Sequence, residues 1–120
     1  MVIVDTSVWV LHLRQGSKAL EQLLTDRQVL CHPFIIGEIA CGHLKNRNEI
    51  LSLLQDIPAV QVAEHDEILG FIERRKLFGL GIGFVDVHLL ASALLDGVKL
   101  WTEDRNLKRI TTQLKIDFQP

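Results

Sequence analysis

Met1-Val2-Ile3-Val4-Asp5-Thr6-Ser7, the opening stretch of the chain, decides the fold, because an apolar β-forming run leads straight into a carboxylate and two hydroxyls. A short, wholly apolar run with these flanks is typical of a buried central strand in a parallel sheet. Ligands bind beyond the carboxyl ends of the strands in open parallel α/β sheets. We therefore expect Asp5 to stand at a functional site, with Thr6 or Ser7 capping the helix that follows.

The rest of the chain alternates short apolar runs with amphipathic segments. Further strands are predicted at residues 28–31, 59–62, 98–102 and 115–118. Helices are predicted at residues 8–13, 17–24, 33–41, 47–54, 64–77, 84–96 and 105–114, and the 84–96 helix is apolar on nearly all sides. This alternation predicts βαβ units. The expected fold class is α/β, a three-layer α/β/α domain with a central, mainly parallel sheet of four to five strands.

Length and composition limit what the protein can be. We expect one domain over residues 1–120, which is long enough to bury a real core. The net charge of −2 excludes a broad basic surface, so nucleic acid would need a local patch or a bound metal. The two cysteines make no disulfide framework, which favours a cytoplasmic protein with reduced thiols. We expect no signal peptide, because Asp5 interrupts the first apolar run, and no membrane span.

Four of the 15 acidic residues stand in places that solvated helix faces do not explain. Asp5 and Asp104 each follow an apolar strand, so they emerge on one edge of the sheet if those strands are neighbours. Glu38 and Asp86 lie at helical spacings from apolar residues. Burying an isolated carboxylate is costly, and proteins usually pair it, protonate it or give it a metal.

Each acid also has a purely structural explanation. Asp5 and Asp104 could cap helices. Asp86 could stand in a first turn, where the helix dipole favours an acid, and Glu38 could reach solvent at the edge of its helix. The conjunction of all four is harder to explain in this way. An oxygen-only cluster suits Mg²⁺ or Mn²⁺ rather than zinc, and such an ion would relieve the repulsion and activate a water.

The segments around these acids resemble the motifs of the PIN-domain nucleases. In chain order they are VIVDTSVW (Val2–Trp9), FIIGEI (Phe34–Ile39), DVHLLASA (Asp86–Ala93) and LWTEDRNL (Leu100–Leu107). The resemblance covers the whole chain in the family's order, and the length agrees with the single-domain VapC toxins of VapB–VapC toxin–antitoxin modules.

The resemblance implies a Mg²⁺- or Mn²⁺-dependent endoribonuclease that forms a homodimer and is inhibited by a VapB-like antitoxin. The four acids would hold the metal and its water for hydrolysis of RNA phosphodiester bonds, leaving a 5′-phosphate and a 3′-hydroxyl. By the same resemblance, the acids or the water would be hydrogen-bonded by Thr6 or Ser7 and by Thr102. Glu103 stands beside Asp104 and could share its role.

A ribonuclease of net negative charge needs local cations for the phosphates. Three candidates lie near the acids in sequence, namely Arg14, Lys45 and Arg105. The densest basic run, Arg74-Arg75-Lys76, is more typical of a solvated helix face. Apolar residues of the first helices, Trp9 and Leu13 among them, could serve an antitoxin or a second subunit, or could simply belong to the core.

Other features favour structure over chemistry. The five histidines show no metal-ligand spacing, and His88 is expected to pack in the core or at an interface. Gly79, Gly81 and Gly83 follow a helix rather than the first strand, which predicts a flexible turn and not a dinucleotide-binding loop. Trp9 and Trp101 are expected to be core residues rather than platforms for bases.

Other functions remain open at this point. A catalytically inactive PIN scaffold that only binds partners would share the fold, although the presence of all four acids argues against it. A receiver-like signalling domain would need adjacent acids after the first strand and a lysine after the last, and neither is present. Within the enzyme hypothesis, the substrate could be DNA or RNA, and transfer, ribosomal and messenger RNA are all compatible with the sequence.

Overall fold

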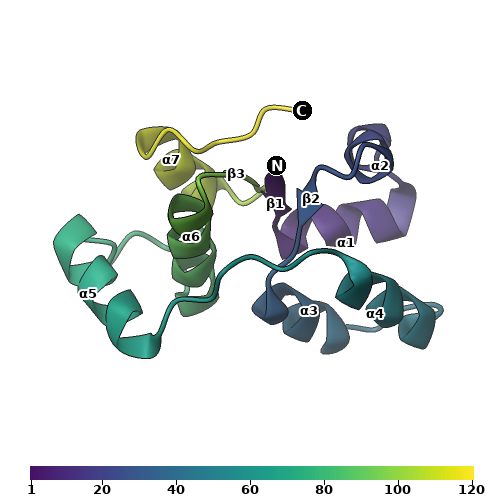
Figure 1. Cartoon of the computed structure of the whole chain (residues 1–120), viewed down its shortest axis with the longest axis horizontal. Coiled ribbons are helices and arrows are strands. Elements are labelled where there is room, and N and C mark those ends of the chain that lie inside the picture. Colours follow the sequence, from purple (N-terminus) through teal and green to yellow (C-terminus); the bar gives the residue numbers. More distant parts are fainter.

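A computed structural model describes all 120 residues and contains a small parallel sheet (Figure 1). Its three strands are β1 (Val2–Val4), β2 (Val29–Leu30) and β3 (Lys99–Trp101), arranged in the order β2-β1-β3. In this register Val2 lies between Val29 and Lys99. The first strand is therefore central, as its wholly apolar sequence predicted.

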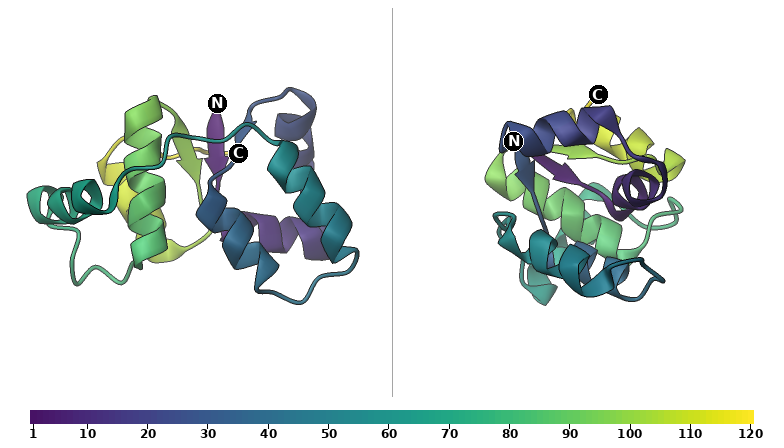
Figure 2. Two further views of the ribbon diagram at one scale, coloured as in Figure 1. Left: turned by 60° about the horizontal axis from the view of Figure 1, so that its bottom comes forward. Right: turned by 90° about the vertical axis from the view of Figure 1, so that its right-hand side faces the viewer.

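Seven helices surround the sheet: α1 (Thr6–Gln15), α2 (Lys18–Thr25), α3 (Pro33–Ala40), α4 (Arg47–Asp56), α5 (His65–Arg75), α6 (Phe84–Asp96) and α7 (Arg105–Gln113). Figures 1 and 2 show α1 to α4 on one side of the sheet and α5 to α7 on the other. The chain runs through α1 to α4 on the first side and crosses to the second side between α4 and α5, before it returns to the sheet as β3. The three-layer α/β/α architecture is confirmed.

Two predicted strands contribute only one bridge each. Ala59 pairs with Cys31 beside β2, and Asp117 pairs with Leu100 beside β3, both in parallel. The first segment cannot pair further because its partner backbone turns into α3 after Cys31. Beyond that point the backbone of Gln61 bonds to side chains of α6, its N–H to Asp96 and its carbonyl to the Ser92 hydroxyl. The sheet thus has three regular strands flanked by two single bridges.

The core lies on both sides of β1. The three residues of β1 are almost completely buried, and α6 buries an unbroken run from Val87 to Ala93, so the helix predicted to be most apolar is also the most buried. Gly97 ends α6 in the left-handed conformation at φ 64°, as expected for a C-terminal glycine. Trp9 and Trp101 are both core residues, as predicted. None of the helices combines the length and apolarity that a membrane crossing requires.

Candidate functional site

Three helices begin at the carboxyl edge of the sheet, and each beginning carries one of the predicted acids. Asp5 is the N-cap of α1 and Asp104 is the N-cap of α7. Asp86 stands in the first turn of α6 and accepts a hydrogen bond from the Gly83 N–H, 3.0 Å away. The structural explanations therefore hold for these three acids. The same helix starts explain why the three acids lie close together. All three helices begin at one edge of the sheet, and a helix N-terminus favours negative charge.

Asp5 is the buried centre of the candidate site, with 5 % of its surface exposed. Its Oδ1 accepts from the Thr6 backbone N–H at 2.7 Å. Its Oδ2 accepts from the hydroxyls of Ser7 at 2.8 Å and Thr102 at 2.7 Å. These donors fix the orientation of the carboxylate at the end of β1.

Glu38 approaches the site from the second turn of α3. Its Oε1 accepts a 2.7 Å hydrogen bond from the hydroxyl of Thr6, the residue that follows Asp5. The side chain is exposed, so of the two alternatives for Glu38 the one in which it reaches solvent holds, and a buried position does not. The reason is that α3 turns this stripe towards solvent: Phe34 and Cys41, which lie at helical spacing from Glu38, are exposed as well.

Hydroxyl groups connect the ends of β1 and β3. Thr102 Oγ1 donates to Asp5 and accepts the backbone N–H of Asp104 at 3.0 Å. Ser7 Oγ donates to Asp5 and accepts the backbone N–H of Glu103 at 3.0 Å. Each hydroxyl thus orients Asp5 and the turn that carries Asp104.

The Glu103 side chain is directed elsewhere. Its Oε1 accepts from the indole N–H of the buried Trp101 at 3.2 Å. Of the two neighbouring acids, Asp104 therefore remains the candidate for the site.

The negative charges of the other three acids act on Asp86. The pKa of Asp86 is raised, first by its partial burial and then by the negative charges of Asp5, Asp104 and Glu38, against the lowering effect of the Gly83 N–H. Glu103 is not among the charges that act on Asp86, and no cation is among them either. The structure therefore gathers four carboxylates without a basic partner to neutralise them.

The free oxygens of this cluster suit a hard divalent cation. Three carboxylate oxygens accept no hydrogen bond from the protein, namely Oε2 of Glu38, Oδ1 of Asp86 and Oδ2 of Asp104. No three His, Cys, Asp or Glu side chains stand in an arrangement that already forms a metal site. The residues nevertheless fit Mg²⁺ or Mn²⁺ in donor chemistry, because the donors are carboxylate oxygens whose repulsion a cation would relieve.

The three predicted phosphate-binding cations lie at different distances from the acids along the fold. Arg105 directly follows Asp104 at the start of α7. Arg14 lies in the last turn of α1, at the opposite end of that helix from Asp5. Lys45 lies in the connection between α3 and α4. All three side chains are exposed, and none donates a hydrogen bond to the four acids.

An aromatic cluster lies beside the site, between α3 and α6. The buried ring of His88 contacts the rings of Phe34 and Phe84 edge to face, with centroids 4.7 Å and 4.9 Å away, so its predicted packing role is confirmed. His32 lies 5.8 Å from His88 and caps α3 by accepting the Phe34 N–H at Nδ1. Burial, together with the nearby His88, lowers the pKa of His32 to about 4.

The structure also reveals one residue near the site that the sequence analysis missed. Asn106, in the first turn of α7, donates from Nδ2 to the carbonyl of Gly81 at 3.2 Å. It thereby attaches the glycine-containing turn before α6 to the helix that Asp104 caps. Its position two residues after Asp104 was the available signal, but the partner lies 25 residues away in the sequence.

Comparison with known proteins identifies the family. A family model described as "PIN domain" matches residues 2–112. Two proteins named "Ribonuclease VapC32", from Mycobacterium tuberculosis strains CDC 1551 / Oshkosh and ATCC 25618 / H37Rv, are each 47% identical over 109 residues, covering 90% of this chain and 88% of theirs. A solved structure, "Crystal structure of PAE2754 from Pyrobaculum aerophilum", matches with a TM-score of 0.60 at 17% identity, covering 95% of this chain and 88% of that one.

These comparisons agree with the architecture described above. At 17% identity the solved structure shows the fold alone. The family model covers nearly the whole chain, and the two named relatives are similar over nearly their whole length. The chain therefore belongs to the PIN domain family, and within it to the VapC-type members.

Proposed function

We propose that this protein is a metal-dependent endoribonuclease and the toxin component of a type II toxin–antitoxin module. The observation that carries the proposal is the gathering of four carboxylates at the carboxyl edge of the sheet, none of which accepts a hydrogen bond from a basic side chain. A cluster of this kind raises the free energy of the folded protein unless a cation occupies it. Its presence in a chain related to proteins named ribonucleases supports a catalytic role.

The four acids play two parts in this proposal: Asp5 is the fixed, buried acid, and the other three are the metal ligands with a free oxygen. Asp5 is held by the hydroxyls of Ser7 and Thr102 at the buried end of β1. Glu38, Asp86 and Asp104 each keep one oxygen free of protein hydrogen bonds. When bound, Mg²⁺ or Mn²⁺ would supply a polarised water and positive charge against the phosphodiester. The exposed Glu38 and Asp104 leave this side of the site open to a chain of nucleotides.

Hydroxyl side chains act as positioning residues in this proposal. Thr6 fixes one oxygen of Glu38 and leaves the other free. Ser7 and Thr102 hold Asp5 and the turn that contains Asp104. Removing one of these hydroxyls changes the relative placement of two acids while all four charges remain. Arg105 is the best-placed cation for the RNA phosphates, because it adjoins Asp104.

The proposed setting is a cytoplasmic homodimer that a VapB-like antitoxin inhibits. An apolar groove of about 300 Å³ offers a surface for the antitoxin; of the two residues suggested by the sequence, the half-buried Leu13 lines it, while Trp9 borders it from the core. The remaining lining residues come from α1, α2 and α4 and the turn after α4, namely His12, Leu24, Ile50, Leu53, Leu54 and Ile57. Occupation of this groove would leave the carboxylate edge free for direct competition with RNA by another antitoxin segment.

The decisive experiment is cleavage of total cellular RNA by purified protein with Mg²⁺, with Mn²⁺ and with EDTA. The wild type should produce metal-dependent fragments, and Asp5→Asn should produce none while keeping its folded circular dichroism spectrum. Glu73→Gln is the matched control, since it removes an exposed acid of α5 and should cleave normally. Mapping the fragment ends would identify the substrate. If neither ion supports cleavage and calorimetry detects no metal binding, a partner-binding scaffold becomes the better account.

A further inference from the structure

The segment between α5 and α6 has an unusual composition for an exposed loop. It contains Phe78 and Leu80, which are 62% and 40% exposed, and it is followed by Phe84 at 43%. Phe78 is the most exposed of the large hydrophobic residues of the chain. A large aromatic side chain held in water is a recognised mark of an interaction surface when it belongs to a contiguous apolar patch.

Hydrogen bonds attach this loop to the candidate site at two points. The N–H of Gly83 donates to Asp86, and the carbonyl of Gly81 accepts from Asn106, which lies two residues after Asp104. Leu77 is buried and anchors the other end of the loop. The loop therefore forms one wall of the carboxylate cluster and is not a free connection.

The backbone of the loop is specified by its glycines. Gly79 and Gly81 have φ values of +68° and +77°, which favour glycine. A Cβ atom on Gly81 would lie 2.5 Å from Nδ2 of Asn106, so a side chain there would displace the Asn106 amide from the Gly81 carbonyl. These two glycines define a turn whose exposed apolar side chains stand between fixed ends.

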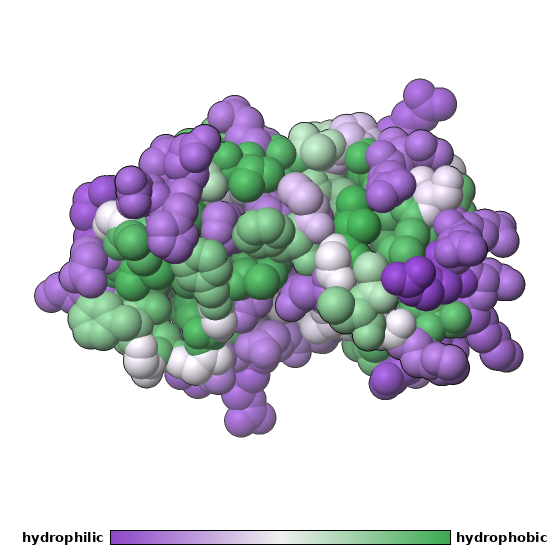
Figure 3. Space-filling view, turned by 90° about the horizontal axis from the view of Figure 1, so that it is seen from below, coloured by the Kyte–Doolittle hydropathy of each residue, from purple (hydrophilic) through white to green (hydrophobic).

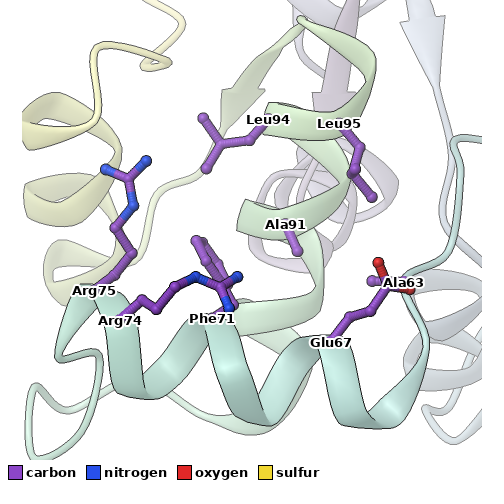
Figure 4. Close-up of a pocket in the computed structure, with 8 residues that line it drawn as sticks. All are labelled: Ala63, Glu67, Phe71, Arg74, Arg75, Ala91, Leu94 and Leu95. Atoms are coloured by element: carbon purple, nitrogen blue, oxygen red, sulfur yellow. The ribbon is translucent and has the colours of Figure 1, made fainter.

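Positive charge immediately precedes the loop. Arg74, Arg75 and Lys76 are all exposed at the end of α5. Figure 4 shows the two arginines extending from α5 at a pocket of about 250 Å³ between α5 and α6. Figure 3 views the molecule from the end where α6 begins, and its left half, on the α5–α6 side, carries apolar surface bordered by hydrophilic residues. This combination of apolar and cationic groups matches the bases and phosphates of a nucleic acid strand.

We propose that residues 77–83, with Phe84, form a recognition loop that stacks an unpaired nucleobase of single-stranded RNA next to the scissile phosphodiester. The inference rests on the proposed ribonuclease function, because the adjoining acids define where the phosphodiester lies. Phe78 is the principal stacking residue, and Lys76, which is exposed where the loop begins, binds a phosphate of the same strand. An RNA strand is favoured over a protein partner because the loop is continuous with both the acid cluster and the basic run.

The test measures binding without cleavage. Phe78→Trp places an exposed indole in a protein whose own tryptophans, Trp9 and Trp101, are buried. Titration in EDTA with a short oligouridylate should quench the emission of the new indole, and the same oligonucleotide with abasic sites should not. Phe78→Ala should weaken oligouridylate binding about 5- to 100-fold, which is the loss expected for one stacked base. Leu69→Ala, which removes an exposed apolar side chain of α5 outside the loop, should bind as the wild type does.

Two results would overturn the recognition loop. If wild type and Phe78→Ala bind the oligonucleotide with equal affinity and Phe78→Trp shows no quenching, the loop does not bind RNA. The ribonuclease proposal would still stand in that case. A change of oligomeric state in Phe78→Ala, measured by light scattering, with unchanged RNA affinity would make the loop a protein contact instead. Failure of the wild type to bind or cleave any RNA overturns the ribonuclease proposal itself, and the recognition loop with it.

Discussion

Thr102 Oγ1 lies 2.7 Å from Oδ2 of Asp5 and joins two residues that are 97 positions apart in the sequence. Both are buried, and the same hydroxyl accepts the backbone N–H of Asp104. One side chain therefore orients the central acid and the start of the helix that carries another acid.

Thr102→Val keeps the shape of this side chain and removes its hydrogen-bonding capacity. We expect a loss of about 1.5–3 kcal/mol in the free energy of unfolding, because a buried carboxylate loses a donor. The variant should also cleave RNA more slowly, through kcat more than KM, since all four charges remain but Asp5 and Asp104 are no longer held together. Urea denaturation and steady-state kinetics measure the two effects, and Thr102→Ser should restore both.

Asp86→Asn should stabilise the protein while abolishing cleavage. Burial and three neighbouring charges raise the pKa of Asp86, so the folded protein binds this proton more readily than the unfolded chain. Its ionisation consequently costs stability at every pH above the raised pKa, and that cost disappears below the unfolded value of about 3.9. Because the side chain is partly exposed, solvent screening limits the gain to on the order of 1 kcal/mol or less.

Thermal denaturation of wild type and Asp86→Asn in EDTA, at pH 7 and at pH 3, tests whether the substitution raises the stability at pH 7 only. The amide oxygen can still accept the Gly83 N–H, so the cap survives the change. A variant less stable than the wild type at pH 7 would contradict the view that the four acids repel one another.

Divalent ions should stabilise the folded protein, because they offset the repulsion among the four acids. Mg²⁺ or Mn²⁺ that binds only the folded state stabilises it by about 2.7 kcal/mol at one hundred times Kd. The melting temperature should therefore rise with ion concentration and return to its starting value with EDTA. Glu38→Gln should reduce the rise, whereas Glu103→Gln should not, because the Glu103 side chain bonds to Trp101.

Mild acid should destabilise the protein through His32. Burial, with a contribution from His88, lowers the pKa of His32 to about 4, below the unfolded value of about 6.5. The stability that depends on neutral His32 is fully present above pH 6.5 and falls as the pH approaches 4, by up to about 3 kcal/mol. His32→Asn keeps an acceptor for the Phe34 N–H and should flatten this dependence in urea titrations. His43→Asn, at an exposed site, should retain the wild-type slope.

A pair of glycine substitutions tests how the loop before α6 is attached. Gly79→Ala and Gly81→Ala both force a side chain into a positive-φ position, at a cost of about 1–2 kcal/mol. Only the second also clashes with Asn106, since nothing lies within 4 Å of the added Cβ at Gly79. Hydrogen exchange of residues 77–83 should therefore accelerate more in Gly81→Ala. Equal acceleration in the two variants would mean that the contact with Asn106 does not hold the loop.

The sequence predicted the secondary-structure elements well where the hydrophobic pattern of a segment matches its burial in the fold. The apolar run of β1 and the all-round apolarity of α6 predicted the central strand and the most buried helix with nearly correct ends. Residues 59–62 have the same β-like composition but form a single bridge, because strand formation there depends on the length of β2. A sequence pattern indicates that a segment can join a sheet, but the length of the neighbouring strand decides how many of its residues pair.

In the candidate site, too, the sequence was enough to place some residues and not others. Strand ends and helix starts were sufficient to bring Asp5, Asp86 and Asp104 together, since caps at one sheet edge converge. The sequence left both a buried and an exposed Glu38 open, because the outcome depends on which face of α3 other helices cover. Arg14 is near Asp5 in the sequence, yet the length of α1 places it at the far end of that helix.

The pairing of β1 with β3 has a consequence for synthesis of the protein. Asp5 leaves the ribosome early, but its neighbours on β3 and its Thr102 partner come from the last quarter of the chain. Parallel pairing over such a separation cannot form before the later strand has emerged. A nascent chain therefore contains Asp5, Glu38 and Asp86 without their assembled site. The candidate site is therefore absent from every shorter nascent chain, and it assembles only once β3 has paired with β1.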